Sequence, residues 1–110
     1  MIYETYSDNS TVNVVVNVQR YPSEKPIKEN VAAARLEAIK LHPQHTGKLI
    51  IDLIGVNFRS QCDYDDFIET VQDKSILHYS RPGKSTFTQT ILRVDGYLYN
   101  NHLNVEYNLG

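Results

Sequence analysis

Asp52 is the carboxylate of this chain that is best placed for chemistry. It stands within residues 49–58, where nearly every other residue is apolar. Burial in such a run would raise the pKa of the carboxyl group and suit it to act as a general acid or base. The alternative is a structural aspartate that hydrogen-bonds to a loop or lies near an accessible edge of a sheet. We favour this second interpretation.

A second group of reactive side chains lies around residues 78–84. It contains His78, Tyr79, Arg81 and Lys84, which are residue types that bind and protonate phosphate groups in small enzymes. In an extended strand, however, His78 and Tyr79 would point to opposite faces of the sheet. An exposed interaction loop explains the group equally well. We therefore keep His78 and Arg81, together with Asp52, only as candidate catalytic residues.

His42 and His45 follow the predicted end of a helix and are the only candidates for a metal site. Two histidines so placed could bind a metal, but no spacing in the sequence supplies a third ligand. Histidine near a helix C-terminus also interacts favourably with the helix dipole. We favour the dipole interpretation and expect no bound metal and no cofactor.

Two sets of side chains point instead to a protein interface. A helix is predicted from about Pro26 to Leu41, and Ala32, Leu36 and Ile39 form a second apolar stripe on it, apart from the stripe that should face a sheet. Tyrosine is frequent in protein interfaces because it offers a broad contact area and a polar tip. The interface candidates among the eight tyrosines are Tyr97, Tyr99 and Tyr107.

The elements that must position these residues follow from periodicity. Residues 11–19 alternate between valine and mainly polar residues, which predicts a half-buried strand. Residues 1–10 form either an edge strand, paired across a turn at residues 7–10, or a frayed arm. Residues 49–58 predict a central strand covered on both faces, and the intervening helix makes the two strands parallel. In the helix, the stripe expected to face the sheet consists of Ile27, Val31, Ala34, Ala38 and Leu41.

The second half of the chain predicts a short helix followed by strands. The helix starts at Ser60 or Asp63 and ends near Lys74. Strands are expected at residues 75–80, 85–94 and 102–109, with turns at Asp95-Gly96 and Asn100-Asn101. The prediction is a single α+β domain over residues 1–110, with about five strands in one layer. Its order is β-α-β-α-β-β-β, with two helices on the sheet and a C-terminal antiparallel meander.

Composition excludes several classes of function. The 110 residues are 41% hydrophobic and 22% charged, as in ordinary globular domains. A net charge of −2 argues against a dedicated nucleic-acid binder, and no apolar run approaches the roughly 18 residues of a membrane span. The single cysteine, Cys62, cannot form an internal disulfide, which favours a reducing, cytoplasmic location.

These observations support two hypotheses. The first is a small, acidic, non-enzymatic interaction protein of the inhibitor, immunity or accessory type, which binds a partner protein or itself through the sheet and the stripe at Ala32, Leu36 and Ile39. The second is a small ligand-binding domain or enzyme with a pocket between the helices and the sheet, using Asp52, His78 and Arg81. We favour the first.

Overall fold

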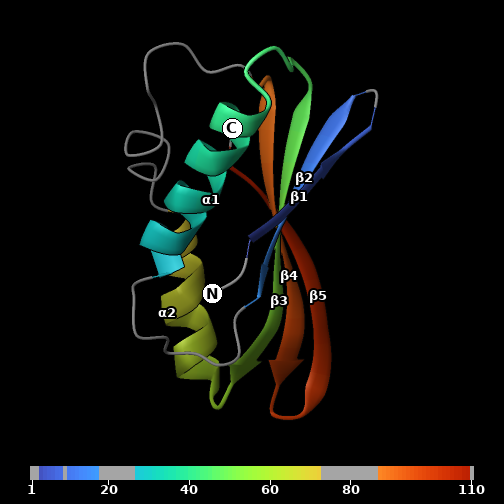
Figure 1. Ribbon diagram of the computed structural model, residues 1–110. Coiled ribbons are helices and arrows are strands. Elements are labelled where there is room, and N and C mark those ends of the chain that lie inside the picture. The colour runs from blue at the N-terminus through green and yellow to red at the C-terminus, as the bar shows by residue number, and fades with distance from the viewer. Residues whose placement is uncertain (1–2, 9, 18–26, 73–86, 110) are drawn as a thin grey trace.

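The fold is a five-stranded sheet with two helices on one of its faces (Figure 1). The computed structural model describes residues 3–8, 10–17, 27–72 and 87–109. The strands lie in the sheet in the same order as in the chain, β1-β2-β3-β4-β5. The elements are β1 (Tyr3–Ser7), β2 (Thr11–Asn17), α1 (Ile27–Leu41), β3 (Lys48–Phe58), α2 (Gln61–Val71), β4 (Gln89–Leu98) and β5 (Asn101–Asn108).

The predicted α+β class with two helices on a single sheet is confirmed, but the element order is β-β-α-β-α-β-β. The N-terminal arm is the edge strand β1, which pairs antiparallel with β2. Asp8 closes the turn between them because its carboxylate accepts hydrogen bonds from the backbone N–H groups of Ser10 (3.0 Å) and Thr11 (2.9 Å). The same bonds lower the pKa of Asp8. The arm is therefore held by a specific turn.

The centre of the sheet is parallel, as two strand-helix-strand units require. β2 pairs parallel with β3 across α1, as predicted, and β3 pairs parallel with β4 across α2. The start of α2 agrees with the predicted start at Ser60 or Asp63. Ser60 caps the helix, because its Oγ accepts a hydrogen bond from the N–H of Asp63 at 3.1 Å. The strand predicted at residues 75–80 lies outside the described residues.

The core lies between the sheet and the two helices. Alternate residues of β2 and β3 face the helices and are fully buried: Val12, Val14, Val16, Leu49, Ile51 and Leu53. Four members of the predicted α1 stripe are buried against them, namely Ile27, Val31, Ala34 and Ala38, whereas Leu41 is exposed. Phe67 of α2 packs its ring edge against Phe58, with centroids 5.1 Å apart. Neither helix in the described part of the chain is long and apolar enough to cross a membrane.

The turn predicted at Asp95-Gly96 is wrong. Both residues lie within β4, and the β4–β5 hairpin turns at Tyr99 and Asn100, whose φ angles of 50° and 64° suit a two-residue turn. Gly96 is needed for packing, because a Cβ atom there would lie 2.0 Å from the carbonyl oxygen of Val56. This contact occurs where β3 bulges at Gly55, whose φ is 83°.

The contact at Gly96 predicts the effect of a single added methyl group. Gly96→Ala should reduce the free energy of unfolding by about 1–3 kcal/mol, because the backbone of β3 must move to admit the side chain. Urea denaturation measures this loss. Asn104→Ala, an exposed change on β5, is the control and should cost less than about 0.5 kcal/mol. A Gly96→Ala protein as stable as the control would contradict the packing described for the bulge.

Candidate functional site

The face of the sheet opposite the helices is the candidate site, and we call it the open face. Because side chains alternate along a strand, the residues between the core positions point to this side. No described helix packs on it (Figure 1). The open face consists of Glu4, Tyr6, Thr11, Asn13, Val15, Asn17, Lys48, Ile50, Asp52, Ile54, Asn57, Gln89, Ile91, Arg93, Asp95, Tyr97, His102, Asn104, Glu106 and Asn108.

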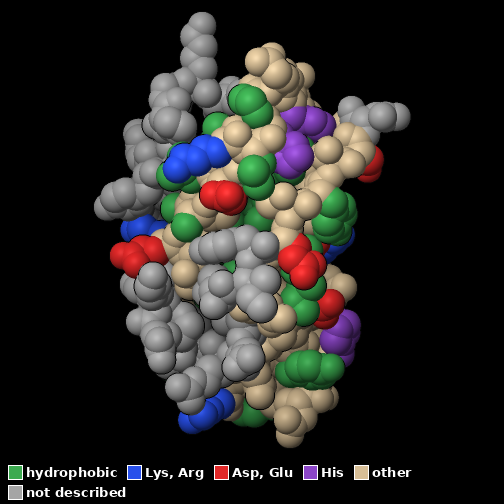
Figure 2. All heavy atoms as spheres, in the orientation of Figure 1, with side chains coloured by type: hydrophobic (Ala, Val, Ile, Leu, Met, Phe, Trp, Pro, Cys, Tyr) green, Lys and Arg blue, Asp and Glu red, His purple; other side chains and the backbone are tan. Residues whose placement is uncertain are grey.

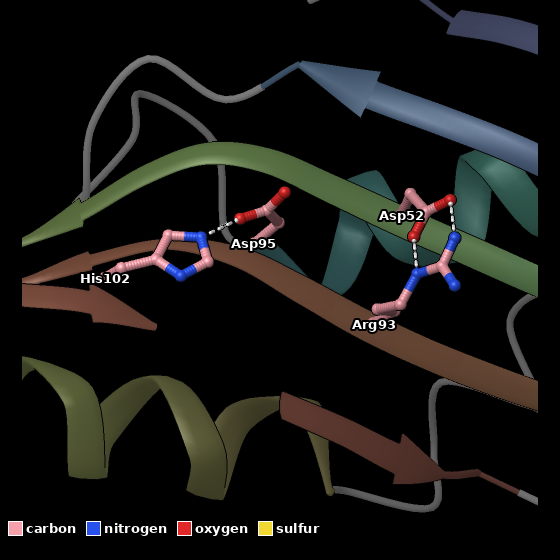
Figure 3. Close-up of polar contacts among 4 residues, drawn as sticks. All are labelled: Asp52, Arg93, Asp95 and His102. Carbon is pink, nitrogen blue, oxygen red and sulfur yellow. Dashed lines mark hydrogen bonds and ion pairs between the residues drawn. The ribbon is translucent and has the colours of Figure 1, made fainter. Parts of the chain in front are cut away.

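An ion pair between Asp52 and Arg93 lies at the centre of the open face (Figure 3). The two residues are directly opposite each other in the register of β3 and β4. The guanidinium group donates from Nε to Asp52 Oδ1 and from Nη2 to Asp52 Oδ2, the latter over 2.7 Å. This two-point contact explains how the carboxylate of Asp52 is buried in an apolar strand. The hydrogen bond from Arg93 to Asp52 also raises the pKa of Arg93.

Carboxylates flank this ion pair on both sides. The register places Glu4 of β1 and Glu106 of β5 in the same row across the sheet as Asp52 and Arg93, and both glutamates are exposed. The row therefore carries three carboxylates and one guanidinium group. Its excess negative charge gives the open face an acidic centre.

A second polar group lies further along the same face (Figure 3). His102 Nε2 lies 2.8 Å from the Oδ1 of Asp95, and both side chains are well exposed to solvent. The ring of Tyr97 meets the ring of His102 edge to face, with centroids 5.9 Å apart. Asp95, His102 and Tyr97 thus form a connected surface cluster at the end of the sheet where β4 and β5 turn.

The open face also exposes large apolar and aromatic side chains. Ile54 is 39% exposed, Tyr97 48% and Tyr6 55%. Asn13 lies on the same face and is buried, and its Oδ1 has no hydrogen-bond partner within the described residues. Such a mixture of aromatic residues, an arginine and a satisfied ion pair is typical of protein-binding surfaces.

Of the three tyrosines predicted at an interface, only Tyr97 lies on the open face. Tyr99 is in the β4–β5 turn, where its hydroxyl accepts a hydrogen bond from the N–H of Gln61 at 3.1 Å and ties the turn to the start of α2. Tyr107 points toward the helices, and its hydroxyl lies 2.7 Å from that of Tyr64. Burial, together with this hydrogen bond, raises the pKa of Tyr107.

The predicted helix stripe offers little accessible surface in the described chain. Ala32 and Ile39 are each only 8% exposed, and Leu36 is half-buried. Ile39 is part of the hydrophobic core cluster. The stripe would therefore contribute only a small area to an interface.

The two predicted metal candidates lie where α1 ends, and histidine side chains are visible on the surface there (Figure 2). His42 continues the helix by donating its N–H to the Ala38 carbonyl at 2.9 Å, and His45 donates its N–H to the His42 carbonyl at 3.2 Å. The Nε2 atoms of both are buried without a hydrogen-bond partner among the described residues. Within those residues, no group of three or more histidine, cysteine or acidic side chains is arranged to hold a metal.

The structure describes one of the three residues of the enzyme hypothesis, Asp52. His78 and Arg81 lie outside the described residues. Asp52 is on the open face, so it does not line a space between the helices and the sheet. Its actual partner, Arg93, and the pair of Asp95 and His102 were not found from the sequence. The available signal was the alternation of polar residues in 91–95 and 102–108, but pairing them requires the strand register.

Comparisons of the chain with protein-family models, with curated proteins and with solved structures gave no match in any of the three. The function is therefore argued from the geometry of the open face.

The ion pair predicts an unequal response to two kinds of substitution. Asp52→Asn leaves the Arg93 guanidinium without its carboxylate in a partly buried position and should cost about 1–3 kcal/mol of unfolding free energy. Replacing both residues by leucine removes both charges and should cost less than Asp52→Asn alone. Urea denaturation of the single and double variants measures both values. Equal stability of Asp52→Asn and the wild type would show that this ion pair does not hold the centre of the face.

Proposed function

We propose that this chain is a non-enzymatic protein-binding domain that receives its partner on the open face. The single observation that carries the proposal is the one-sided packing of the helices, which leaves Tyr6, Ile54 and Tyr97 exposed on the other side of the sheet. Burying these side chains against a partner would remove apolar surface from water, which is the main favourable term in protein association.

The polar groups of the open face support binding rather than catalysis. The carboxylate of Asp52 already accepts two hydrogen bonds from Arg93, which is the arrangement of a structural ion pair rather than of a proton acceptor awaiting a substrate. Asp95 and His102 are well exposed on a strand surface. The reacting groups of enzyme sites, in contrast, lie where water is excluded. Exposed polar groups set orientation and specificity in an interface.

The position of the ion pair also fits an interface. Energetically important interface residues cluster at the centre of a contact, with arginine and tyrosine over-represented. Here Arg93 is central and held in one geometry by Asp52, with Tyr6 and Tyr97 around it. A partner would meet side chains that are already ordered, which lowers the entropic cost of binding.

Site-specific photo-crosslinking in cells of the source organism tests this proposal. A photoreactive residue at Tyr97 should give a discrete adduct with a partner protein. The same residue at Glu37, which is exposed on α1, is the matched control and should not give that adduct. Adding Ile54→Asp to the Tyr97 variant should abolish the adduct, because it places an unpaired charge in the contact. Circular dichroism verifies that the variants are folded.

Two results would contradict the proposal. One is the same adduct from Glu37 as from Tyr97, which would place the contact on no particular face. The other is an adduct from Tyr97 that persists at full yield when Ile54 is aspartate.

A further inference from the structure

The exposed charges beside the central ion pair of the open face are negative. Glu4 and Glu106 are exposed on β1 and β5, and neither forms an ion pair with a described residue. Arg93 lies directly opposite Glu106, but its guanidinium group binds Asp52 instead. Lys48 is on the same face at the start of β3, about 13 Å along the strand from Asp52. The row of the ion pair therefore offers two carboxylates to solvent, and the guanidinium group within it is already bound.

A buried acceptor on the same face also lacks a donor. Asn13 is 8% exposed, and its Oδ1 has no hydrogen-bond partner within the described residues. In the register it lies between Tyr6 of β1 and Ile50 of β3, one open-face position along β2 from the row of Glu4. A buried oxygen without a donor costs free energy, so a contact that supplies an N–H group there is favoured. The face therefore offers acceptors at its edges and beside its centre.

Tyr6 is the neighbour best placed to uncover the Asn13 oxygen. It stands directly opposite Asn13 in the register of β1 and β2, on the outermost strand of the described sheet, and is 55% exposed. Exposed side chains change rotamer within nanoseconds, and such changes are common where proteins bind. A rotation of Tyr6 would therefore let a donor reach Asn13 without a change in the backbone.

We propose that the partner of the open face is a basic protein, with lysine or arginine side chains that reach Glu4 and Glu106 and an N–H donor for Asn13. The inference rests on the proposed function and names the chemistry of its partner. The two glutamates stand four strand spacings apart, or about 19 Å, so one cation cannot serve both. The partner must carry positive charge at both edges of the contact. An acidic partner would meet repulsion at both glutamates, and complementary charge of this kind selects between partners.

Charge reversal in the photo-crosslinking assay tests the inference. With the photoreactive residue at Tyr97, Glu4→Lys combined with Glu106→Lys should lower the yield of the partner adduct about tenfold, because attraction at both edges becomes repulsion. Glu37→Lys combined with Glu69→Lys changes the net charge equally on the two helices and should leave the yield unchanged. If circular dichroism shows that the lysine variant is unfolded, Glu4→Gln combined with Glu106→Gln replaces it and should lower the yield about threefold.

Asn13→Leu separates binding from stability. Leucine branches at the same atom as asparagine and removes the buried oxygen that lacks a donor, so the urea midpoint of the isolated protein should stay the same or rise. The yield of the Tyr97 adduct should nevertheless fall about fivefold, because the donor of the partner loses its acceptor. An unchanged yield in Asn13→Leu overturns the contact at Asn13.

The outcomes distinguish this inference from the proposed function. A Tyr97 adduct that keeps its full yield when Glu4 and Glu106 are both lysine overturns the inference and leaves the open-face proposal intact. An equal loss of adduct in the variant at Glu37 and Glu69 also overturns it, because net charge alone would then explain the loss. If Tyr97 gives no adduct when all four glutamates are present, the proposed function is contradicted and the inference falls with it.

Discussion

Both helices pack on the same face of the sheet, and this constraint determines what each strand must carry. On the covered side, valine, leucine and isoleucine fill the space beneath α1 and α2, and Ala34 and Ala38 let α1 approach closely. On the other side, no described helix removes the sheet from water. The middle of that side is still crowded by neighbouring strands, so Asp52 is buried there and needs the guanidinium group of Arg93. The ion pair thus satisfies a buried carboxylate on the face that no described helix covers.

The sequence predicted the elements better than their arrangement. The alternation of valines in β2 identified a half-buried strand, and four of five residues of the expected α1 stripe are buried. β3 was predicted to be covered on both faces because it is apolar at nearly every position, yet Ile54 is well exposed on the open face. An apolar run cannot distinguish a second covering layer from a surface that remains open.

The turn at Asp95-Gly96 failed for a related reason. Asp-Gly is a strong local turn signal, but Gly96 is required by the carbonyl of Val56 on a neighbouring strand, and this contact has no local signature. The candidate site was missed in the same way. Arg93 and His102 find their partners through the registers of β3 with β4 and of β4 with β5. Register depends on the packed sheet as a whole, whereas Asp52 could be singled out from its own apolar surroundings.

Binding of a partner requires that the open face be accessible in the isolated protein. Nuclear magnetic resonance with a soluble paramagnetic probe tests it most directly, because the probe broadens methyl signals in proportion to their exposure. Ile54 and Ile51 lie on opposite faces of the same strand. Ile54 is 39% exposed, whereas Ile51 is 0% exposed. We expect strong broadening of the Ile54 methyl signals and none of the Ile51 methyl signals. Equal protection of the two residues would show that both faces of the sheet are covered and would contradict an accessible open face.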